Sequence, residues 1–272
     1  MIYPLNIATY NTQFSTNPQK IKDDVLALVQ QGVFVICLQE IVHYDRSIFI
    51  LDTLQKVLGS DWREISNLGK EKNNKGMGNS ILWNEKKIKL ETMQKIFLPK
   101  SKFLSIHELL FSLIAGGVLV PFQRRSVIGT FRLRGKRIRI TNLHLDHNGG
   151  LYNRQKQLEY VLNCIRKDKK VDGEVICGDF NILDIRKNSE EYELQKRIIG
   201  SDFQDVTSNI AWTADIGNTK FKYGSFVNLL IRYIHIRRKL DFIWVKNMKS
   251  IKSKTLPLNA SDHVPLIAFL KI

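Results

Sequence analysis

The chain has 272 residues, of which 43% are hydrophobic, and this is enough for one large α/β domain or two small ones, with a buried core. It carries 42 Lys and Arg against 26 Asp and Glu, a formal net charge of +16, so its expected partners are polyanions: nucleic acid or an anionic membrane surface. Three cysteines, an odd number, indicate buried free thiols and not a disulfide framework or a zinc site. The sequence opens without the pattern of a signal peptide, which predicts a cytoplasmic protein, and no obligate protein partner is inferred.

The first segments alternate between strand and helix patterns. Apolar and β-prone residues from 5 to 10 predict a strand that ends at Asn11. Apolar residues at helical spacing predict a helix over 18–31. Residues 33–38 form an unbroken apolar run, which predicts a strand that is buried on both faces and ends in a polar pair, the second of which is Glu40.

Glu40 has two explanations. It is the first exposed residue beyond the sheet, or it is a metal ligand. A ligand fits the position because a hard divalent cation such as Mg²⁺ binds carboxylate and amide oxygens and leaves room for water and phosphate.

The next stretch leads to a third strand. The pattern predicts a second amphipathic helix over 45–58, a basic loop rich in Asn and Gly over 70–78, and a strand over 79–83. Asn79, at the start of that strand, could donate a hydrogen bond to a phosphate oxygen or could cap the loop.

An apolar insert near residues 97–123 follows, and its most apolar part is 103–120. Its length approaches that of a membrane span, but internal His and Glu residues and a Gly-Gly pair argue against one. A helix packed on the core, an apolar lid and an interfacial membrane helix are the remaining interpretations, the last because basic residues flank the segment. Arg125, in the basic flank, is a candidate for binding the substrate.

From residue 126 onward the pattern is mostly that of strands. Alternating apolar and polar residues over 126–133 and 136–143 predict a hairpin, and the second strand runs into His144. A histidine at a strand end is either a surface residue or a catalytic one. A helix is predicted over 154–167.

Residues 175–183 carry the strongest chemical signal. The apolar run 175–177 predicts a buried strand, and Gly178 lets the backbone turn so that Asp179 and Asn181 project from the same edge. A carboxylate and an amide held in this way can activate a water and hold a phosphoryl oxygen. Taken alone, the same residues could be an ordinary turn.

The last third combines a helix pattern over 190–199 with a basic segment over 220–254. That segment has ten Lys or Arg against one acid, with aromatic residues between them, which is typical of a nucleic-acid surface or of a solvated face. Within it, residues 238–245 predict a strand with Asp241 near its head.

A final loop places Asp262 and His263 ahead of the last predicted strand, 266–270. All the acids, amides and imidazoles singled out therefore lie at predicted strand ends, in the order Asn11, Glu40, His144, Asp179 with Asn181, Asp241, and Asp262 with His263. Their order and local contexts closely resemble the endonuclease/exonuclease/phosphatase superfamily over residues 5–270, and in particular its deoxyribonuclease and neutral sphingomyelinase branches.

The resemblance implies an α/β fold: a four-layer sandwich of two packed mixed β-sheets flanked by helices, in a single domain over 1–272. It implies a Mg²⁺ cofactor, with Mn²⁺ as the alternative. Glu40 would be the principal ligand, and Asn11 and Asp262 would complete or support the metal shell.

The resemblance also implies a hydrolytic mechanism. Asp179 would orient or deprotonate the attacking water, and Asn181 would hold that water or a phosphate oxygen. His263, oriented by Asp241, would bind the scissile phosphate. His144 would bind phosphate or protonate the leaving oxygen; the Glu that the deoxyribonuclease branch supplies beside its histidine has no counterpart in this sequence.

Three functions agree with these residues. The first is a Mg²⁺-dependent nuclease, favoured by the basic excess and by segment 220–254. The second is a phospholipid phosphodiesterase of the sphingomyelinase kind, favoured by segment 103–120. The third is an inactive protein that uses the fold to bind nucleic acid. The presence of a suitable residue at every matched chemical position argues against this third function.

Overall fold

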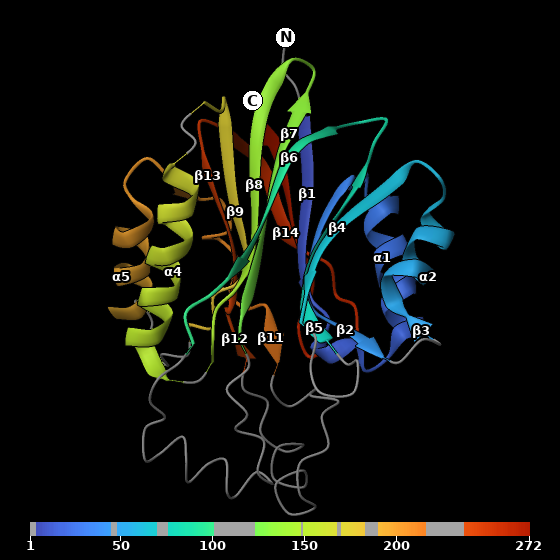
Figure 1. Cartoon of the computed structure of the whole chain (residues 1–272), viewed down its shortest axis with the longest axis horizontal. Coiled ribbons are helices and arrows are strands. Elements are labelled where there is room, and N and C mark those ends of the chain that lie inside the picture. Colours follow the sequence, from blue (N-terminus) through green and yellow to red (C-terminus); the bar gives the residue numbers. More distant parts are fainter. Residues whose placement is uncertain are drawn as a thin grey trace, which may run out of the picture.

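The structure, a computed structural model, describes residues 4–44, 48–69, 76–100, 123–147, 149–167, 170–182, 190–215 and 237–272. Two β-sheets lie face to face, with helices on the outer side of each (Figure 1). The predicted four-layer sandwich of two mixed sheets flanked by helices is confirmed.

The first sheet has seven strands in the order β14-β15-β1-β2-β5-β4, with β3 paired to β2. Their bounds are β1 (Pro4–Asn11), β2 (Val35–Tyr44), β3 (Ile48–Phe49), β4 (Trp62–Leu68), β5 (Gly76–Asn84), β14 (Lys249–Thr255) and β15 (Leu266–Lys271). The sheet is mixed because β1 and β2 run parallel, whereas the other pairs are antiparallel.

The second sheet has six strands in the order β10-β13-β9-β8-β7-β6. They are β6 (Lys89–Phe97), β7 (Arg125–Leu133), β8 (Lys136–His144), β9 (Gly173–Asp179), β10 (Gln204–Asp205) and β13 (Asp241–Lys246). Its parallel pair is β8 with β9. A short ribbon of β11 (Ala214–Asp215) and β12 (Arg237–Arg238) stands beside it.

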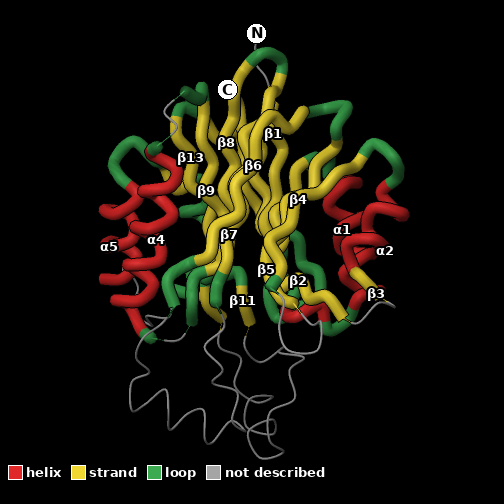
Figure 2. Tube along the Cα trace, in the orientation of Figure 1, coloured by secondary structure: helices red, strands yellow, loops and turns green. Residues whose placement is uncertain are grey.

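The helices form the outer layers (Figure 2). α1 (Pro18–Gln30) and α2 (Ile50–Leu58) lie outside the first sheet, and α4 (Gly150–Arg166) and α5 (Glu190–Ile199) lie outside the second. A short 3-10 turn, η1 (Gln13–Ser15), follows β1. The helix predicted over 45–58 begins only at Ile50, after the short strand β3, whereas α1 and α5 lie almost where they were predicted.

Three apolar clusters hold these layers together: one between the sheets, one under α1 and α2, and one under α4 and α5. β2 contributes to two of them, since Val35 and Cys37 face the other sheet while Ile36 and Leu38 pack in the cluster with α1. The prediction that this strand is buried on both faces is therefore confirmed. The three cysteines are free, also as predicted.

The longer strands that sequence patterns missed lie at the sheet edges: β4, β6 and β14. An edge strand has one neighbour and much exposed surface, so it has no need for an apolar alternation. In β6, for example, most side chains are exposed, including Met93 and Phe97 at 57% and 51%. The central strands, which are buried, are the ones that sequence patterns identified.

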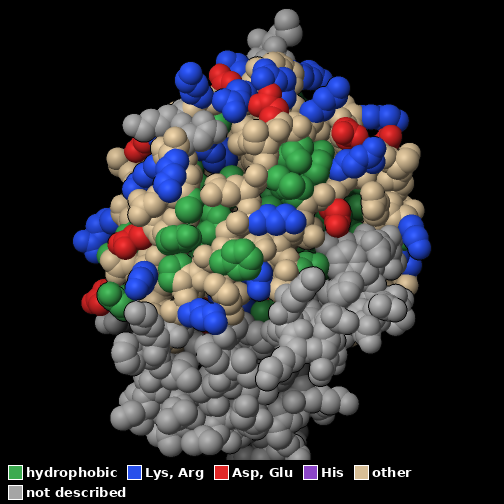
Figure 3. All heavy atoms as spheres, viewed as in Figure 1, with side chains coloured by type: hydrophobic (Ala, Val, Ile, Leu, Met, Phe, Trp, Pro, Cys, Tyr) green, Lys and Arg blue, Asp and Glu red, His purple; other side chains and the backbone are tan. Residues whose placement is uncertain are grey.

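Two predicted segments lie largely or wholly outside the described residues: the apolar segment 103–120, and 220–236 of the basic segment. Among the residues that are described, no helix is long and apolar enough to cross a membrane. On the face shown in Figure 3, Lys and Arg are more widespread than Asp and Glu. This distribution agrees with the basic excess of the sequence.

A buried polar link joins the two sheets. The side-chain amide of Asn142 in β8 donates to the backbone carbonyls of Leu38 and Ser80 in the other sheet, at 2.9 and 2.8 Å. Its carbonyl oxygen accepts from Gln39 Nε2 at 2.7 Å. Neither Asn142 nor Gln39 is exposed to solvent. Satisfied polar groups in a core fix a specific geometry, so this link sets how the two sheets stand against each other.

We expect Asn142→Leu to lower the free energy of unfolding by about 2–4 kcal/mol, because it removes hydrogen bonds from several buried polar groups at once. Urea unfolding followed by circular dichroism measures the loss. Ile140→Val, a buried change in the same strand, is the control and should cost about 0.5–1.5 kcal/mol. A loss no larger than that of the control would contradict the role given to the link.

Candidate active site

Segments far apart in the sequence meet at one end of the sandwich, the lower end in Figure 1, where β11 and β12 lie. Pairing of β8 with β9 sets His144 beside Asp179, and pairing of β9 with β13 sets Asp179 beside Asp241. Asn11, at the end of β1, reaches across from the other sheet. Strand register thus brings three of the predicted residues together, and a hydrogen bond between the sheets adds Asn11.

The structure corrects the predicted place of Glu40. β2 does not end there but continues to Tyr44, and Gln39 with Glu40 forms a bulge at a register shift opposite β5. Glu40 has a φ of +55°, in the left-handed region. A bulge redirects a side chain out of the regular alternation. Here it lets a carboxylate reach the site from mid-strand, where its Oε2 accepts from the backbone N–H of Phe14 at 3.1 Å.

Asp179 is the hub of the site and is 2% exposed. Its Oδ2 accepts from Asn11 Nδ2 at 2.9 Å, and its Oδ1 accepts from the backbone N–H of Asn181 at 2.9 Å. The Nε2 atoms of His144 and His263 lie 3.5 and 4.0 Å from Oδ2. Both predicted histidines therefore face the same carboxylate oxygen.

His263 is oriented by Asp241, as the resemblance implied. Its Nδ1 lies 2.7 Å from Asp241 Oδ2. Because an ionised carboxylate only accepts, Nδ1 is the donor in this hydrogen bond. The other oxygen of Asp241 is buried and has no hydrogen-bond partner among the described residues.

Backbone contacts hold the loop that carries Asp262 and His263. Ala214 of β11 forms a bridge with His263, and the Asp215 N–H donates to the carbonyl of Asp262 at 2.8 Å. On the other side, Ser261 Oγ donates to the backbone carbonyl at the end of β1 at 2.8 Å. The loop is thereby fixed to the first sheet and to the β11–β12 ribbon, which holds the backbone of Asp262 and His263 in place.

The left-handed turn at residues 13–15 supplies contacts that sequence patterns missed. All three residues have φ values between +46° and +56°. Gln13 donates from its backbone to Asn11 Oδ1 and from its side chain to Asp262 Oδ2, both at 3.0 Å. No spacing or motif marks Gln13 in the sequence, since its role depends on a backbone conformation that is unusual for its residue type.

Arg124 is the second site residue that was missed. It is 3% exposed, and its Nη1 lies 3.2 Å from His144 Nδ1 and 4.0 Å from Glu40 Oε1. Its Nη2 lies 2.6 Å from His147 Nδ1, and its Nε lies 3.6 Å from Asp146 Oδ1. In the sequence, Arg124 is marked only as the first of two adjacent arginines before a predicted strand. That pattern also fits the basic flank of the apolar insert and does not indicate a site residue.

Asn79 and Arg125, the candidates for binding the substrate, lie beside these residues, and so does Asn181. Asn79 is 1% exposed, and its amide donates to the backbone carbonyl of Arg125 at 2.8 Å, so it links the sheets. The guanidinium of Arg125 lies over the Phe97 ring, 4.7 Å from its centroid. Asn181 donates from Nδ2 to the carbonyl of Leu145 at 2.8 Å. Contacts of these side chains with a substrate stay predictions.

Burial raises the pKa of three carboxyl groups in the site. Burial is the largest cause for Glu40, where Arg124 opposes it, and for Asp262. For Asp179, burial and then the charge of Asp241 raise the pKa to about 7, against the opposing charge of His263. These shifts mean that burial disfavours the ionised form of each carboxyl group, and that the positive groups nearby do not fully offset this effect.

The two histidines are shifted in opposite directions. Burial and then the charge of Arg124 hold the pKa of His144 well below its ordinary value. Burial acts in the same direction on His263, but the charge and hydrogen bond of Asp241, together with the charges of Asp179 and Asp262, outweigh it and raise its pKa well above the ordinary value. The surroundings therefore favour the charged form of His263 and the neutral form of His144.

The residues fit a divalent cation in two ways. In the first set, burial and, to a smaller extent, the charge of Asp262 raise the pKa of Glu40, so these two carboxylates influence each other within the same site. A second set has possible ligand atoms within 4.8 Å of one another: Asp179, Asp241 and His263. In that second set the histidine is already hydrogen-bonded to Asp241, so we favour the predicted all-oxygen set as the Mg²⁺ site: Asn11, Glu40 and Asp262.

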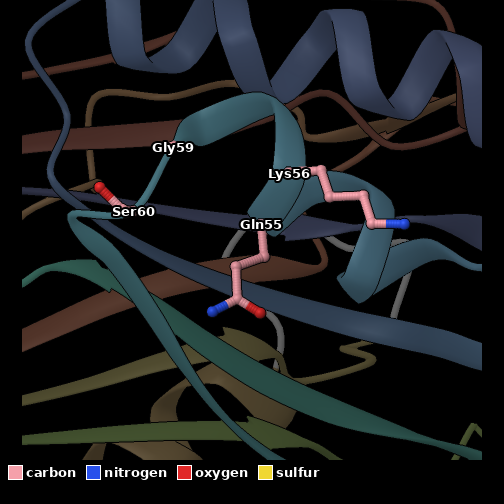
Figure 4. A pocket seen from close by; sticks show the side chains of 4 residues that line it. All are labelled: Gln55, Lys56, Gly59 and Ser60. Atoms are coloured by element: carbon pink, nitrogen blue, oxygen red, sulfur yellow. The ribbon is translucent and has the colours of Figure 1, made fainter.

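A surface hollow at the end of α2 is not part of this site (Figure 4). It is lined by Gln55, Lys56, Gly59 and Ser60, none of which is an acid or a histidine. The adjoining end of β4 pairs Trp62 with Asn84, whereas Asn79 marks the site end of the same strand pair. The hollow therefore lies at the far end of the sheet.

Comparison with known proteins supports the fold. No protein-family model matches the sequence, and no curated protein matches it significantly. An endonuclease/exonuclease/phosphatase from Bacteroides vulgatus is 18% identical, with a TM-score of 0.68 and 98% of each chain covered. D. rerio TDP2 complexed with single-strand DNA product is 14% identical, with a TM-score of 0.68 and 98% of each chain covered.

A third solved structure, the mannosyl-6-phosphatase Bt3783 from Bacteroides thetaiotaomicron, is 15% identical, with a TM-score of 0.68 over 98% of this chain and 99% of that one. At such identities a match shows the fold and not the substrate. The chain thus has the fold of the endonuclease/exonuclease/phosphatase superfamily, which the sequence motifs had predicted.

We expect Asp179→Asn to be more stable than the wild type in EDTA, by an amount that grows with pH. The pKa of Asp179 is raised in the folded state to about 7, so folding favours the protonated form. That contribution is complete below the unfolded pKa, near 3.9, and is lost as pH rises to about 7, at up to roughly 1.4 kcal/mol per pH unit.

Urea unfolding of both proteins at pH 5, 6, 7 and 8 measures this difference. Asp202→Asn, which changes an exposed aspartate paired with Lys246 on the surface, controls for the general loss of one acid. A difference between Asp179→Asn and the wild type that stays constant with pH would contradict the raised pKa.

Proposed function

We propose that the protein hydrolyses phosphodiester bonds of nucleic acid with the help of Mg²⁺. The observation that carries this proposal is the meeting of the predicted acids, amides and histidines at one end of the sandwich, from segments as distant as Asn11 and His263. If these residues were only ordinary turn formers, their side chains would not be expected to meet in one place.

Glu40, Asn11 and Asp262 would hold the cation. When bound, Mg²⁺ would supply positive charge to a nonbridging phosphate oxygen. Burial raises the pKa values of Glu40 and Asp262, and a bound cation would stabilise their ionised forms, which supports a cation at this position.

Asp179 would orient the attacking water and accept its proton. A general base works best when its pKa is near the working pH, and the pKa of Asp179 is about 7. The amide of Asn11 and the backbone N–H of Asn181 hold this carboxylate in place. Asn181 would hold the water or a phosphate oxygen.

His263 would bind the scissile phosphate as a charged donor. Asp241 holds its Nδ1 and keeps the ring positively charged, which leaves Nε2–H for a phosphate oxygen. A fixed donor of this kind stabilises negative charge as it develops in the transition state. His144, on the other side of Asp179, would act on the phosphate or on the leaving oxygen.

Nucleic acid is the substrate that the rest of the molecule favours. The net charge of +16 suits a polyanion. Two cation–π pairs flank the site: Arg125 over Phe97, next in sequence to Arg124, and Arg237 over Trp212, near the bridge to His263. Aromatic and arginine surfaces of this kind stack on bases.

A phospholipid phosphodiesterase is the second candidate, because segment 103–120 is apolar and has basic flanks. In either case we propose one domain over 1–272, with the insert near 97–123 as an addition to it. The two candidates share the metal-site chemistry and differ only in what the outer surface binds.

We expect Asp179→Asn and His263→Ala each to lower the rate of DNA cleavage roughly a hundredfold to a thousandfold, because the first removes the proposed base for the attacking water and the second removes a proposed donor to the phosphate. The assay is nicking of supercoiled plasmid and cutting of a single-stranded oligonucleotide, in Mg²⁺ and in EDTA. Asp202→Asn should cleave at the wild-type rate. Near-native turnover by either site variant, with a native circular dichroism spectrum, would refute the assignment.

If the protein is a phospholipid phosphodiesterase, its binding to lipid vesicles should persist at high salt concentration. We expect the protein to bind anionic phosphatidylserine vesicles only through charge, so that cosedimentation disappears at about 1 M salt, where the Debye length is about 3 Å. Deleting 103–120 should not change this result. Binding that persists in salt and is lost on the deletion would favour the phospholipid phosphodiesterase.

A further inference from the structure

Arg124 holds an unusual position for an arginine. It lies just ahead of β7 and is 3% exposed, and each of its two terminal nitrogens faces a histidine ring. Its ion pairs are longer: Nε lies 3.6 Å from Asp146 Oδ1, and Nη1 lies 4.0 Å from Glu40 Oε1. The contacts with the imidazole rings are shorter than these ion pairs, so they are the ones that need an explanation.

The contact with His144 fixes the hydrogens of that ring. Arg124 Nη1 lies 3.2 Å from His144 Nδ1. A guanidinium has five N–H donors and no acceptor, so Nδ1 must supply the lone pair. The hydrogen of a neutral imidazole is then on Nε2, and a charged imidazolium would set a second N–H against the guanidinium.

The tautomer matters because of where Nε2 lies. It is 3.5 Å from Asp179 Oδ2 and 3.7 Å from Glu40 Oε1, between the proposed base and the proposed metal ligand. An N–H there faces both carboxylates, and under the proposed function the substrate phosphate would bind beside them. The opposite tautomer would present a lone pair to the carboxylates and could not bind phosphate.

We propose that Arg124 is a positioning residue that locks His144 in its neutral Nε2–H form, so that His144 binds a phosphate oxygen and does not protonate the leaving group. This inference rests on the proposed hydrolysis and decides between the two roles left open for His144. The leaving oxygen would then take its proton from water.

The same guanidinium reaches a second ring. Arg124 Nη2 lies 2.6 Å from His147 Nδ1, and the donor argument applies again. One arginine therefore sets the tautomer of two imidazoles, His144 and the half-exposed His147. This also gives His147 a place in the site, which the sequence motifs did not.

Nitrogen-15 NMR of the histidine rings in the metal-free protein tests the inference without any assay of activity. We expect His144 to show an unprotonated Nδ1 and a protonated Nε2 at neutral pH, with its signals assigned by their absence in His144→Gln. A protonated Nδ1 in the wild type would overturn the inference directly, whether or not any variant folds.

Arg124→Met, which keeps the length of the side chain and removes its donors, should mix the two tautomers and lower kcat/KM for cleavage roughly tenfold to a hundredfold, as loss of an orienting partner typically does. Arg124→Lys should lie between Arg124→Met and the wild type. The matched control is Arg139→Met, which removes an equally buried arginine of β8 that is bonded to Glu174.

Arg139→Met should leave the His144 signals unchanged. If Arg124→Met keeps a single Nε2–H tautomer, Arg124 does not set it and the inference fails. If the tautomer depends on Arg124 while the wild type cleaves no phosphodiester, the inference about the ring stands and the proposed function fails.

Discussion

The site depends on one electrostatic constraint: carboxylates are held together where water is largely excluded. Glu40, Asp179 and Asp241 are 8%, 2% and 1% exposed, and Asp262 joins them from its loop. Buried carboxylates that lack compensation are costly. Arg124 and His263 are the positive groups that lie beside these acids, and the proposed Mg²⁺ would offset negative charge that they do not.

Backbone strain serves the same constraint. Among the described residues, seven other than glycine have a positive φ, and five of them lie at the site: Gln13, Phe14, Ser15, Glu40 and Asn181. Each such residue costs roughly 1–3 kcal/mol. The turn directs backbone and side-chain N–H groups at the acids, and the bulge at Glu40 places a carboxylate among them. The strain is retained because two packed sheets and the Asn142 link hold the surrounding strands rigid.

Burial explains how much of the fold and of the candidate site could be predicted from the sequence. Central strands are covered on both faces, so their apolar runs reveal them, and Asp179 could be identified because it follows such a run. Edge strands such as β6 carry no such pattern. Gln13 and Arg124 escaped prediction for a different reason: each acts through a partner more than ten residues away, and neither the left-handed turn nor the contact with His144 leaves a local signal.

The two histidines show why such partners matter. His144 and His263 are both buried at strand ends and both face Asp179, and nothing in their local sequence separates their roles. Nδ1 of His144 contacts the guanidinium of Arg124, whereas Nδ1 of His263 contacts the carboxylate of Asp241. Because an arginine can only donate, the first ring keeps a lone pair at Nδ1, whereas the aspartate accepts from the second ring and its negative charge favours the protonated imidazolium. The two rings, alike in their local sequence, are therefore distinguished by the residue behind each of them.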